Sequence, residues 1–144
     1  MRTVHHILTS KGPAVWSVSR DATVYEALQL MSEKNVGALP VLDGSVLAGI
    51  FSERDYARNV ILKGKSSKEM RVWEIMTSPV VTVAPSASIE ECMRLMTGER
   101  VRHLPVVDSG QLSGIVTIGD VVKEIIADQR DTIDHLNGYI VGKA

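Results

Sequence analysis

A hydroxyl side chain and a carboxylate stand three residues apart in two similar motifs of the chain. The first pair is Ser52 and Asp55, within "GIFSERDYAR"; the second is Thr117 and Asp120, within "GIVTIGDVVK". A hydroxyl at the start of a helix can donate to a phosphate oxygen, and a helix N-terminus favours anions. A carboxylate one turn further cannot bind phosphate, but it can accept hydrogen bonds from both hydroxyls of a ribose. The two pairs therefore suit a nucleoside phosphate.

A purely structural role for each pair is also open. Serine and threonine are good helix N-caps, and an acidic residue three positions later forms a relative of the capping box. The carboxylate would also lie favourably at the positive end of the helix dipole. In the ligand-binding interpretation, Gly49 and Gly114, which precede the two pairs, leave space for a close backbone approach.

The pairs recur because the chain contains two copies of one unit. Residues 15–61 align with residues 80–126 without a gap. Each copy has a short β-rich run, a capped amphipathic helix, two strands that could form a hairpin, and a last helix. The predicted fold class is α/β (α+β), with two β-α-β-β-α repeats packed as a pseudo-twofold pair. The predicted divisions are a first repeat at 10–64, a second repeat at 73–130 and a C-terminal helical tail at 131–144.

The composition narrows the classes of function. The 144 residues are 44% hydrophobic and 23% charged, with a net charge of −1, so no basic surface for nucleic acid or an anionic membrane is expected. No apolar run approaches the roughly 18 residues needed to span a bilayer, and the first residues are too polar for a secretory signal. The single cysteine, Cys92, is predicted to pack in the core. We expect a cytoplasmic protein.

The repeated motifs resemble the CBS domain (cystathionine β-synthase domain) family, whose tandem pairs are called Bateman modules. The resemblance covers roughly residues 10–130 and is carried by "MTSPVVTVAPSASIEECMRLM", "RVRHLPVVD", "GIFSERD" and "GIVTIGD"; the C-terminal "IDHLNGYI" resembles the tail of stand-alone bacterial two-CBS proteins. It implies a signal-transduction or regulatory sensor module that binds an adenine nucleotide in clefts between the repeats. AMP is the favoured ligand, and ADP, ATP, NAD(H) and S-adenosylmethionine are alternatives. No catalytic residue and no metal site is expected.

The resemblance also implies which residues form the two clefts. Ser52 and Asp55 fall at the phosphate and ribose positions of one cleft, and Thr117 and Asp120 at those of the other. The expected adenine walls are Val15, Trp16, Ala38 and Pro40 in one cleft, and Met76, Thr77, Val81, His103 and Pro105 in the other. The cations expected near the phosphates are Arg54 and Lys65 for the first repeat, and Arg100, Arg102 and His103 for the second. Because these cations differ, the clefts are expected to differ in affinity or ligand.

A non-enzymatic sensor is the leading hypothesis, and a ligand-independent dimerisation or interaction scaffold is the alternative. An enzyme would need converging titratable groups, whereas Asp55 and Asp120 are expected in separate clefts. We expect a homodimer, because apolar residues remain on the second helix of each repeat and on the tail. These residues are Tyr56, Val60, Ile61, Val121, Ile125, Ile126, Ile133, Leu136 and Ile140. A downstream protein partner is expected; nucleic acid and membrane are not expected partners.

Overall fold

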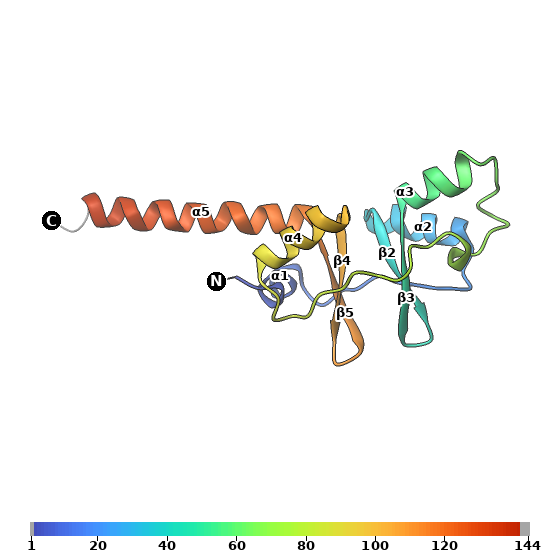
Figure 1. Cartoon of the computed structure of the whole chain (residues 1–144), viewed down its shortest axis with the longest axis horizontal. Coiled ribbons are helices and arrows are strands. Elements are labelled where there is room, and N and C mark those ends of the chain that lie inside the picture. The colour runs from blue at the N-terminus through green and yellow to red at the C-terminus, as the bar shows by residue number, and fades with distance from the viewer. Residues whose placement is uncertain (1, 142–144) are drawn as a thin grey trace.

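The computed structural model describes residues 2–141, with side chains described through Asn137. Two similar halves lie side by side, and each has a β-hairpin with helices at one end (Figure 1). The first elements are α1 (Val4–Lys11), β1 (Val18–Ser19), α2 (Val24–Lys34), β2 (Ala38–Asp43), β3 (Val46–Ser52) and α3 (Glu53–Tyr56), which a π-helical turn continues at Ala57–Ile61. The others are a 3-10 turn (Val72–Glu74), α4 (Ile89–Glu99), β4 (His103–Asp108), β5 (Gln111–Thr117) and α5 (Ile118–Val141). Helix α5 extends well beyond the rest of the molecule (Figure 1).

The two hairpins have the same register. Strands β2 and β3 are antiparallel, with β1 added in parallel to β2, and β4 pairs with β5 in the same antiparallel way. The register shifts between Val41 and Leu42 in one hairpin and between Val106 and Val107 in the other, which are corresponding positions. The two sheets meet where β3 contacts β5. The repeat predicted from the sequence is therefore present in the backbone, including its irregularity.

The opening strands of the repeats are shorter than predicted. Residues 15–18 were expected to be β-rich, but β1 begins only at Val18. In the second repeat, a single bridge joins Val83 to Val106.

The helix starts follow the capping signals in the sequence. Thr23 caps α2 in a complete capping box with Glu26. The Ser88 hydroxyl accepts from the backbone N–H of Glu91 at 3.1 Å at the start of α4. Both helices end on a residue in the left-handed region, Asn35 in α2 and Arg100 in α4. Asparagine tolerates this backbone conformation better than arginine does.

The segment that opens each half packs into the core of the other half. We call residues 4–11 and 72–77 the opening segments. Val4 and Val72 are both fully buried. Val4 lies in the core that α4, β4 and β5 form, whereas Val72 lies in the core of α2, β2 and β3. Each half therefore needs the opening segment of the other half to complete its core.

Backbone hydrogen bonds fix this exchange of opening segments. The Val4 N–H donates to the carbonyl of Ala87 at 2.9 Å, and the Val72 N–H donates to the carbonyl of Ala22 at 2.9 Å. Since Ala22 and Ala87 come just before the caps of α2 and α4, each opening segment also holds the helix start of the other half.

The cores correct one prediction and confirm another. Val60 and Val121, expected on a surface that pairs two copies, are both fully buried inside the molecule. Ile61 and Ile126 are exposed. Cys92 is buried, as predicted, and burial raises the pKa of its thiol. None of the helices in residues 2–141 is long and apolar enough to cross a bilayer.

Candidate ligand-binding cleft

One cavity joins the first hydroxyl–carboxylate pair to the second half of the molecule. We call it the first cleft: a cavity of about 760 Å³ where the end of β3 and α3 face the end of α4 and the start of β4. A volume of this size suits a small-molecule ligand. The lining residues are Gly37, Ile50, Ser52, Glu53, Arg54, Asp55, Arg58, Thr77, Glu99, Arg100, Val101, Arg102 and His103.

Ser52 and Asp55 form a capping box at the start of α3. The Asp55 Oδ2 accepts from the Ser52 N–H at 2.9 Å and from the Ser52 Oγ at 3.0 Å. In return, the Asp55 N–H donates to the Ser52 Oγ at 3.2 Å. Ser52 and Asp55 therefore do cap the helix. Both residues also line the first cleft, so a ligand in the cleft could reach them. The cap fixes the carboxylate that a ligand would meet.

Thr77 donates a further hydrogen bond to the Asp55 carboxylate. Its hydroxyl donates to Asp55 Oδ1 at 3.1 Å. Its backbone pairs with Ile50 through two hydrogen bonds of 2.8 and 3.0 Å. The pairing is possible because position 49 is glycine: a Cβ there would lie 2.6 Å from Met76 Sδ and 2.9 Å from the carbonyl oxygen of Thr77. The close backbone approach expected at Gly49 is therefore made by the chain itself.

Four arginine side chains line the first cleft, two from each half of the molecule. They are Arg54, Arg58, Arg100 and Arg102. All four are exposed, and within residues 2–141 none of them forms an ion pair. Two further carboxylates, Glu53 and Glu99, share the lining. Guanidinium groups that lack a protein partner are suited to phosphate oxygens, which they can bind through two parallel hydrogen bonds.

His103 lies at the inner wall of the first cleft. It is half-buried, and its ring is close to Gly37, where a Cβ would lie 3.7 Å from the histidine Nε2. Burial lowers the pKa of His103, and the positive charge of Lys11 lowers it further. The side chain is consequently neutral near pH 7, and it offers a hydrogen bond rather than a charge to a ligand.

The second hydroxyl–carboxylate pair, at the start of α5, has the same cap and a different neighbour. Asp120 Oδ2 accepts from the Thr117 N–H at 2.9 Å, and the Asp120 N–H donates to Thr117 Oγ1 at 3.1 Å. The Lys11 ammonium donates to Asp120 Oδ2 at 2.8 Å and to the carbonyl of Ile115 at 2.9 Å. We call the surroundings of this pair the second cleft. Its carboxylate already has a cation from the same chain.

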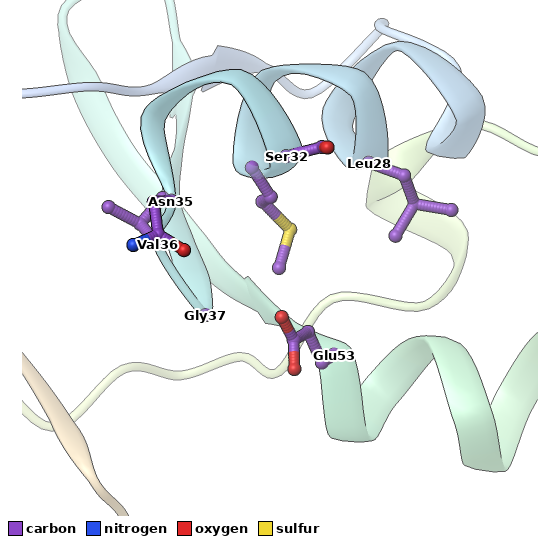
Figure 2. Close-up of a pocket in the computed structure, with 7 residues that line it drawn as sticks. Leu28, Ser32, Asn35, Val36, Gly37 and Glu53 are labelled. Atoms are coloured by element: carbon purple, nitrogen blue, oxygen red, sulfur yellow. The ribbon is translucent and has the colours of Figure 1, made fainter.

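Two smaller hollows beside the clefts show how the repeats have diverged. One, of about 350 Å³, lies between α2 and the start of α3, where the Glu53 side chain points up toward α2 (Figure 2). It is also lined by Asn35 and Gly37. The corresponding hollow beside α4, of about 310 Å³, has Arg100 and Arg102 at the matching positions. The hollow beside α2 therefore carries a negative charge, whereas the hollow beside α4 carries positive charges.

The structure brings seven of the predicted residues into the first cleft. These are Ser52, Arg54, Asp55, Thr77, Arg100, Arg102 and His103. Thr77, Arg102 and His103 were expected in the cleft of the second repeat, and here they line the same cavity as Ser52 and Asp55. The exchange of opening segments is the reason, since it carries residue 77 to the edge of β3.

The other predicted site residues lie outside the lining of this cavity. Thr117 and Asp120 lie at the start of α5, beside the Lys11 ammonium. Trp16 is exposed beneath the Lys34 ammonium, 4.2 Å from the ring centroid, and Lys65 is exposed in the connector. The remaining residues are buried or half-buried outside the first cleft: Val15, Ala38, Pro40, Met76, Val81 and Pro105.

Lys11 and Arg58 were not predicted from the sequence as site residues. A signal for Lys11 exists in the sequence. "VHHILTS" at 4–10 matches "VWEIMTS" at 72–78, so the repeat begins earlier than residue 10. Between this block and the next aligned block stand residues 11–14 in the first copy and residue 79 alone in the second. The extra residues begin with Lys11.

Comparison with known proteins agrees with this architecture. The model of the CBS domain family matches residues 5–61 and 72–127. The chain is 40% identical over 150 residues to the mitochondrial CBS domain-containing protein CBSX3 of Arabidopsis thaliana, covering 97% of this chain and 72% of that protein. It is 36% identical over 121 residues to CBS domain-containing protein YhcV of Bacillus subtilis, covering 84% of each.

Solved structures show the same pairing of repeats. A protein with CBS domains from Burkholderia ambifaria superposes with a TM-score of 0.84 at 53% identity, covering 89% of this chain and 96% of that one. The CBS domain pair of protein MJ0100, solved with 5′-methylthioadenosine and S-adenosyl-L-methionine, shares the fold at a TM-score of 0.77 and 24% identity. The two family matches, the close relatives and the shared fold together show that this chain belongs to the CBS domain family, as a tandem pair of CBS repeats.

Proposed function

We propose that this protein is a regulatory module that binds an adenine nucleotide in the first cleft without transforming it. The observation that carries the proposal is the cavity itself. It joins a fixed ribose-type acceptor, Asp55, to four arginines that lack ion-pair partners among residues 2–141. An acceptor for a diol on one side and cations on the other match the two polar ends of a nucleotide.

The geometry suggests how each part of a nucleotide would be held. Ribose hydroxyls would donate to Asp55, replacing or sharing the hydrogen bond from Thr77. Phosphate oxygens would meet the arginines and the start of α3. The base would lie against the apolar part of the lining, which includes Ile50 and Val101. The Ser52 cap keeps the carboxylate in place, so little ordering of this side chain is required when the ligand binds.

The adenosyl class rests on the family as well as on the cavity. The MJ0100 domain pair was solved with two adenosyl compounds, and the Burkholderia ambifaria protein is named for a proposed role in signal transduction. AMP, ADP, ATP, NAD(H) and S-adenosylmethionine all contain adenosine, whose ribose hydroxyls would donate to Asp55. AMP is the first ligand to test, and a cytoplasmic sensor of one of these compounds is the function we propose.

Calorimetric titration tests this proposal directly. The protein would be titrated with AMP, ATP, NADH and S-adenosylmethionine, with GTP as the contrast, while chromatography monitors any turnover. We expect at least one adenosyl ligand to bind unchanged. Asp55→Ala removes a charged hydrogen-bonding partner worth about 1.5–3 kcal/mol, so affinity should fall roughly ten- to hundredfold. Failure of every adenosyl ligand to bind would refute the proposal, and consumption of a bound ligand would identify an enzyme instead.

A specific surface also favours self-association, the second function considered. Four exposed apolar side chains follow α5: Val122, Ile126, Ile133 and Leu136. Their spacing of four, seven and three residues places them along one side of the helix. We propose that α5 pairs two copies of the chain, which is compatible with ligand binding in the first cleft.

A further inference from the structure

We propose that each chain binds one nucleotide, in the first cleft, because the Lys11 ammonium occupies the second cleft in place of a ligand. This inference rests on the proposed function and adds to it the number of sites and the residue that sets that number. It depends on two pairs of hydrogen bonds. The acceptors are equivalent residues of the two repeats, whereas the donors differ between the two halves.

Lys11 donates to the counterparts of the two groups to which Thr77 donates in the first cleft. There, the Thr77 N–H donates to the carbonyl of Ile50 at 2.8 Å, and its hydroxyl donates to Asp55 at 3.1 Å. In the second cleft, one ammonium donates to the carbonyl of Ile115 at 2.9 Å and to Asp120 at 2.8 Å. Ile115 and Asp120 are the counterparts of Ile50 and Asp55. A neutral donor is thus replaced by a cation.

The extra residues after the first opening segment explain the replacement. In the second opening segment, the 3-10 turn ends at Glu74 and the chain then extends along β3 as far as Thr77. In the first, α1 remains helical to Lys11 and ends at Gly12, whose φ of 91° suits glycine. The second cleft is therefore bordered by a helix end with a lysine, where the first is bordered by an extended edge.

The packing before this point is equivalent in the two halves, so the difference is local. Leu8 covers Gly114 as Met76 covers Gly49: a Cβ on Gly114 would lie 2.5 Å from a Leu8 methyl carbon. Val4 and Val72 are both fully buried. The backbone of Lys11 is consequently held in place by a packed helix, and its ammonium is held by the hydrogen bonds to Ile115 and Asp120.

The consequence is a change in what the second carboxylate can bind. A ribose diol would have to compete with a charge-assisted hydrogen bond at Asp120, which is stronger than one between neutral groups. The second cleft also has fewer cations where a phosphate would lie. The counterparts of Arg54, Arg58, Arg100 and Arg102 are Gly119, Lys123, Asn35 and Gly37. Of these four positions, only Lys123 keeps a cation, and Glu53 lies in the hollow beside Asn35 and Gly37.

Titration calorimetry with ATP, and separately with AMP, measures the number of sites per chain. We expect one site in the wild type. Asp55→Ala should abolish or weaken binding at least tenfold, whereas Asp120→Ala should leave both affinity and stoichiometry unchanged. Lys11→Met keeps the aliphatic stem and removes the charge, so a second, weaker site that depends on Asp120 should appear. Lys63→Met, an exposed lysine of the connector, is the matched control and should behave as the wild type.

Three outcomes would overturn this inference while leaving the proposed function intact: two equivalent sites in the wild type, loss of wild-type binding in Asp120→Ala, or no second site in Lys11→Met. If AMP, ATP, NADH and S-adenosylmethionine all failed to bind the wild type, the proposed function itself would be refuted. Thermal unfolding of every variant shows that each is folded, so a loss of binding cannot be mistaken for a loss of structure.

Discussion

Arg100 carries its charge on a backbone conformation that its side chain does not favour. It ends α4 at a φ of 56°, where the other repeat ends α2 with Asn35 at 55°. We expect Arg100→Asn to keep or slightly raise stability, because asparagine tolerates this region. Loss of the cation should lower ATP affinity about tenfold, or about 1.4 kcal/mol. AMP affinity should fall less, since AMP has fewer phosphates to contact the arginines. Calorimetry and thermal unfolding measure the two effects.

The matched control for this variant is Arg94→Gln. Arg94 is exposed on the same helix and lies outside the lining of the first cleft. Unchanged ATP binding in Arg100→Asn, or an equal loss in Arg94→Gln, would show that the guanidinium of residue 100 does not recognise phosphate.

His103 makes stability depend on pH. Burial, and then the charge of Lys11, lowers its folded-state pKa below the ordinary value of 6.5. Its neutral form is therefore the one that folding favours. The stabilising contribution is complete above pH 6.5 and is lost as the pH falls through the folded-state pKa. In urea unfolding between pH 7.5 and 5, His103→Gln should show a smaller loss of stability than the wild type. His5→Gln, at an exposed position, should not; an identical pH profile in His103→Gln would contradict the prediction.

Sequence alone could predict the pair Ser52 and Asp55, because a cap and its partner are three residues apart and the motif is local. The capping box at Thr23 was predictable for the same reason. The walls of the first cleft were not, because they depend on contacts between residues far apart in the chain. Thr77 reaches Asp55 only through the exchange of opening segments. A pattern that repeats along the sequence does not say which copy packs on which.

At the scale of strands, Gly49 in β3 and Gly114 in β5 are equivalent, but an added Cβ would contact different groups at the two positions. A Cβ at position 49 would lie 2.9 Å from the backbone carbonyl of Thr77, which is fixed by pairing. The three atoms nearest to a Cβ at position 114 all belong to the side chain of Leu8, which can rotate. Gly49→Ala should therefore cost about 1–3 kcal/mol as overpacking, and Gly114→Ala less. Chemical denaturation of both variants measures the difference; equal costs would contradict it.

At the scale of helices, Arg2 holds the start of the chain to α5. Its guanidinium contacts Glu124 at 2.7 Å, Asp128 at 2.7 Å, and Asp131. Because Glu124 is buried, removing its partner leaves a carboxylate poorly compensated. Arg2→Met should lower the melting temperature. Arg94→Met, which breaks only an exposed pair of 3.9 Å with Glu91, should barely change it. Equal melting temperatures in the two variants would show that Arg2 does not anchor α5.

The order of elements was predictable from the repeat, whereas the length of α5 was not fully so. The spacing of Ile133 and Leu136 indicated a helical tail. The structure shows that the tail continues α5 without interruption from Ile118 to Val141. Ile140, also expected on the pairing surface, lies beyond the side chains that the structure describes. The predicted leftover surface included buried residues because a periodic pattern gives the apolar side of a helix but not what covers it.

At the scale of the whole molecule, we expect a homodimer formed through α5. Light scattering should give about twice the chain mass of 15.7 kDa. Ile126 and Ile133 are 44% and 55% exposed, and burying each would contribute up to about 1.5–3 kcal/mol. The double variant Ile126→Glu with Ile133→Glu should therefore be monomeric. Val46→Glu, at an exposed apolar position of the β2–β3 hairpin, serves as the control. A monomeric wild type, or dissociation by Val46→Glu, would contradict the prediction.

The exchange of opening segments bears on how such a chain can arise. A single copy of the unit would leave the apolar side of its opening segment uncovered, because that segment completes the core of a neighbour. Two separate copies would satisfy each other by domain swapping, so the tandem chain is equivalent to a swapped dimer whose protomers have been joined end to end. Joining removes the symmetry that identical copies must share. In a dimer of one gene product, extra residues at the end of the opening segment would alter both clefts together; in the fused chain they alter one and leave the other unchanged.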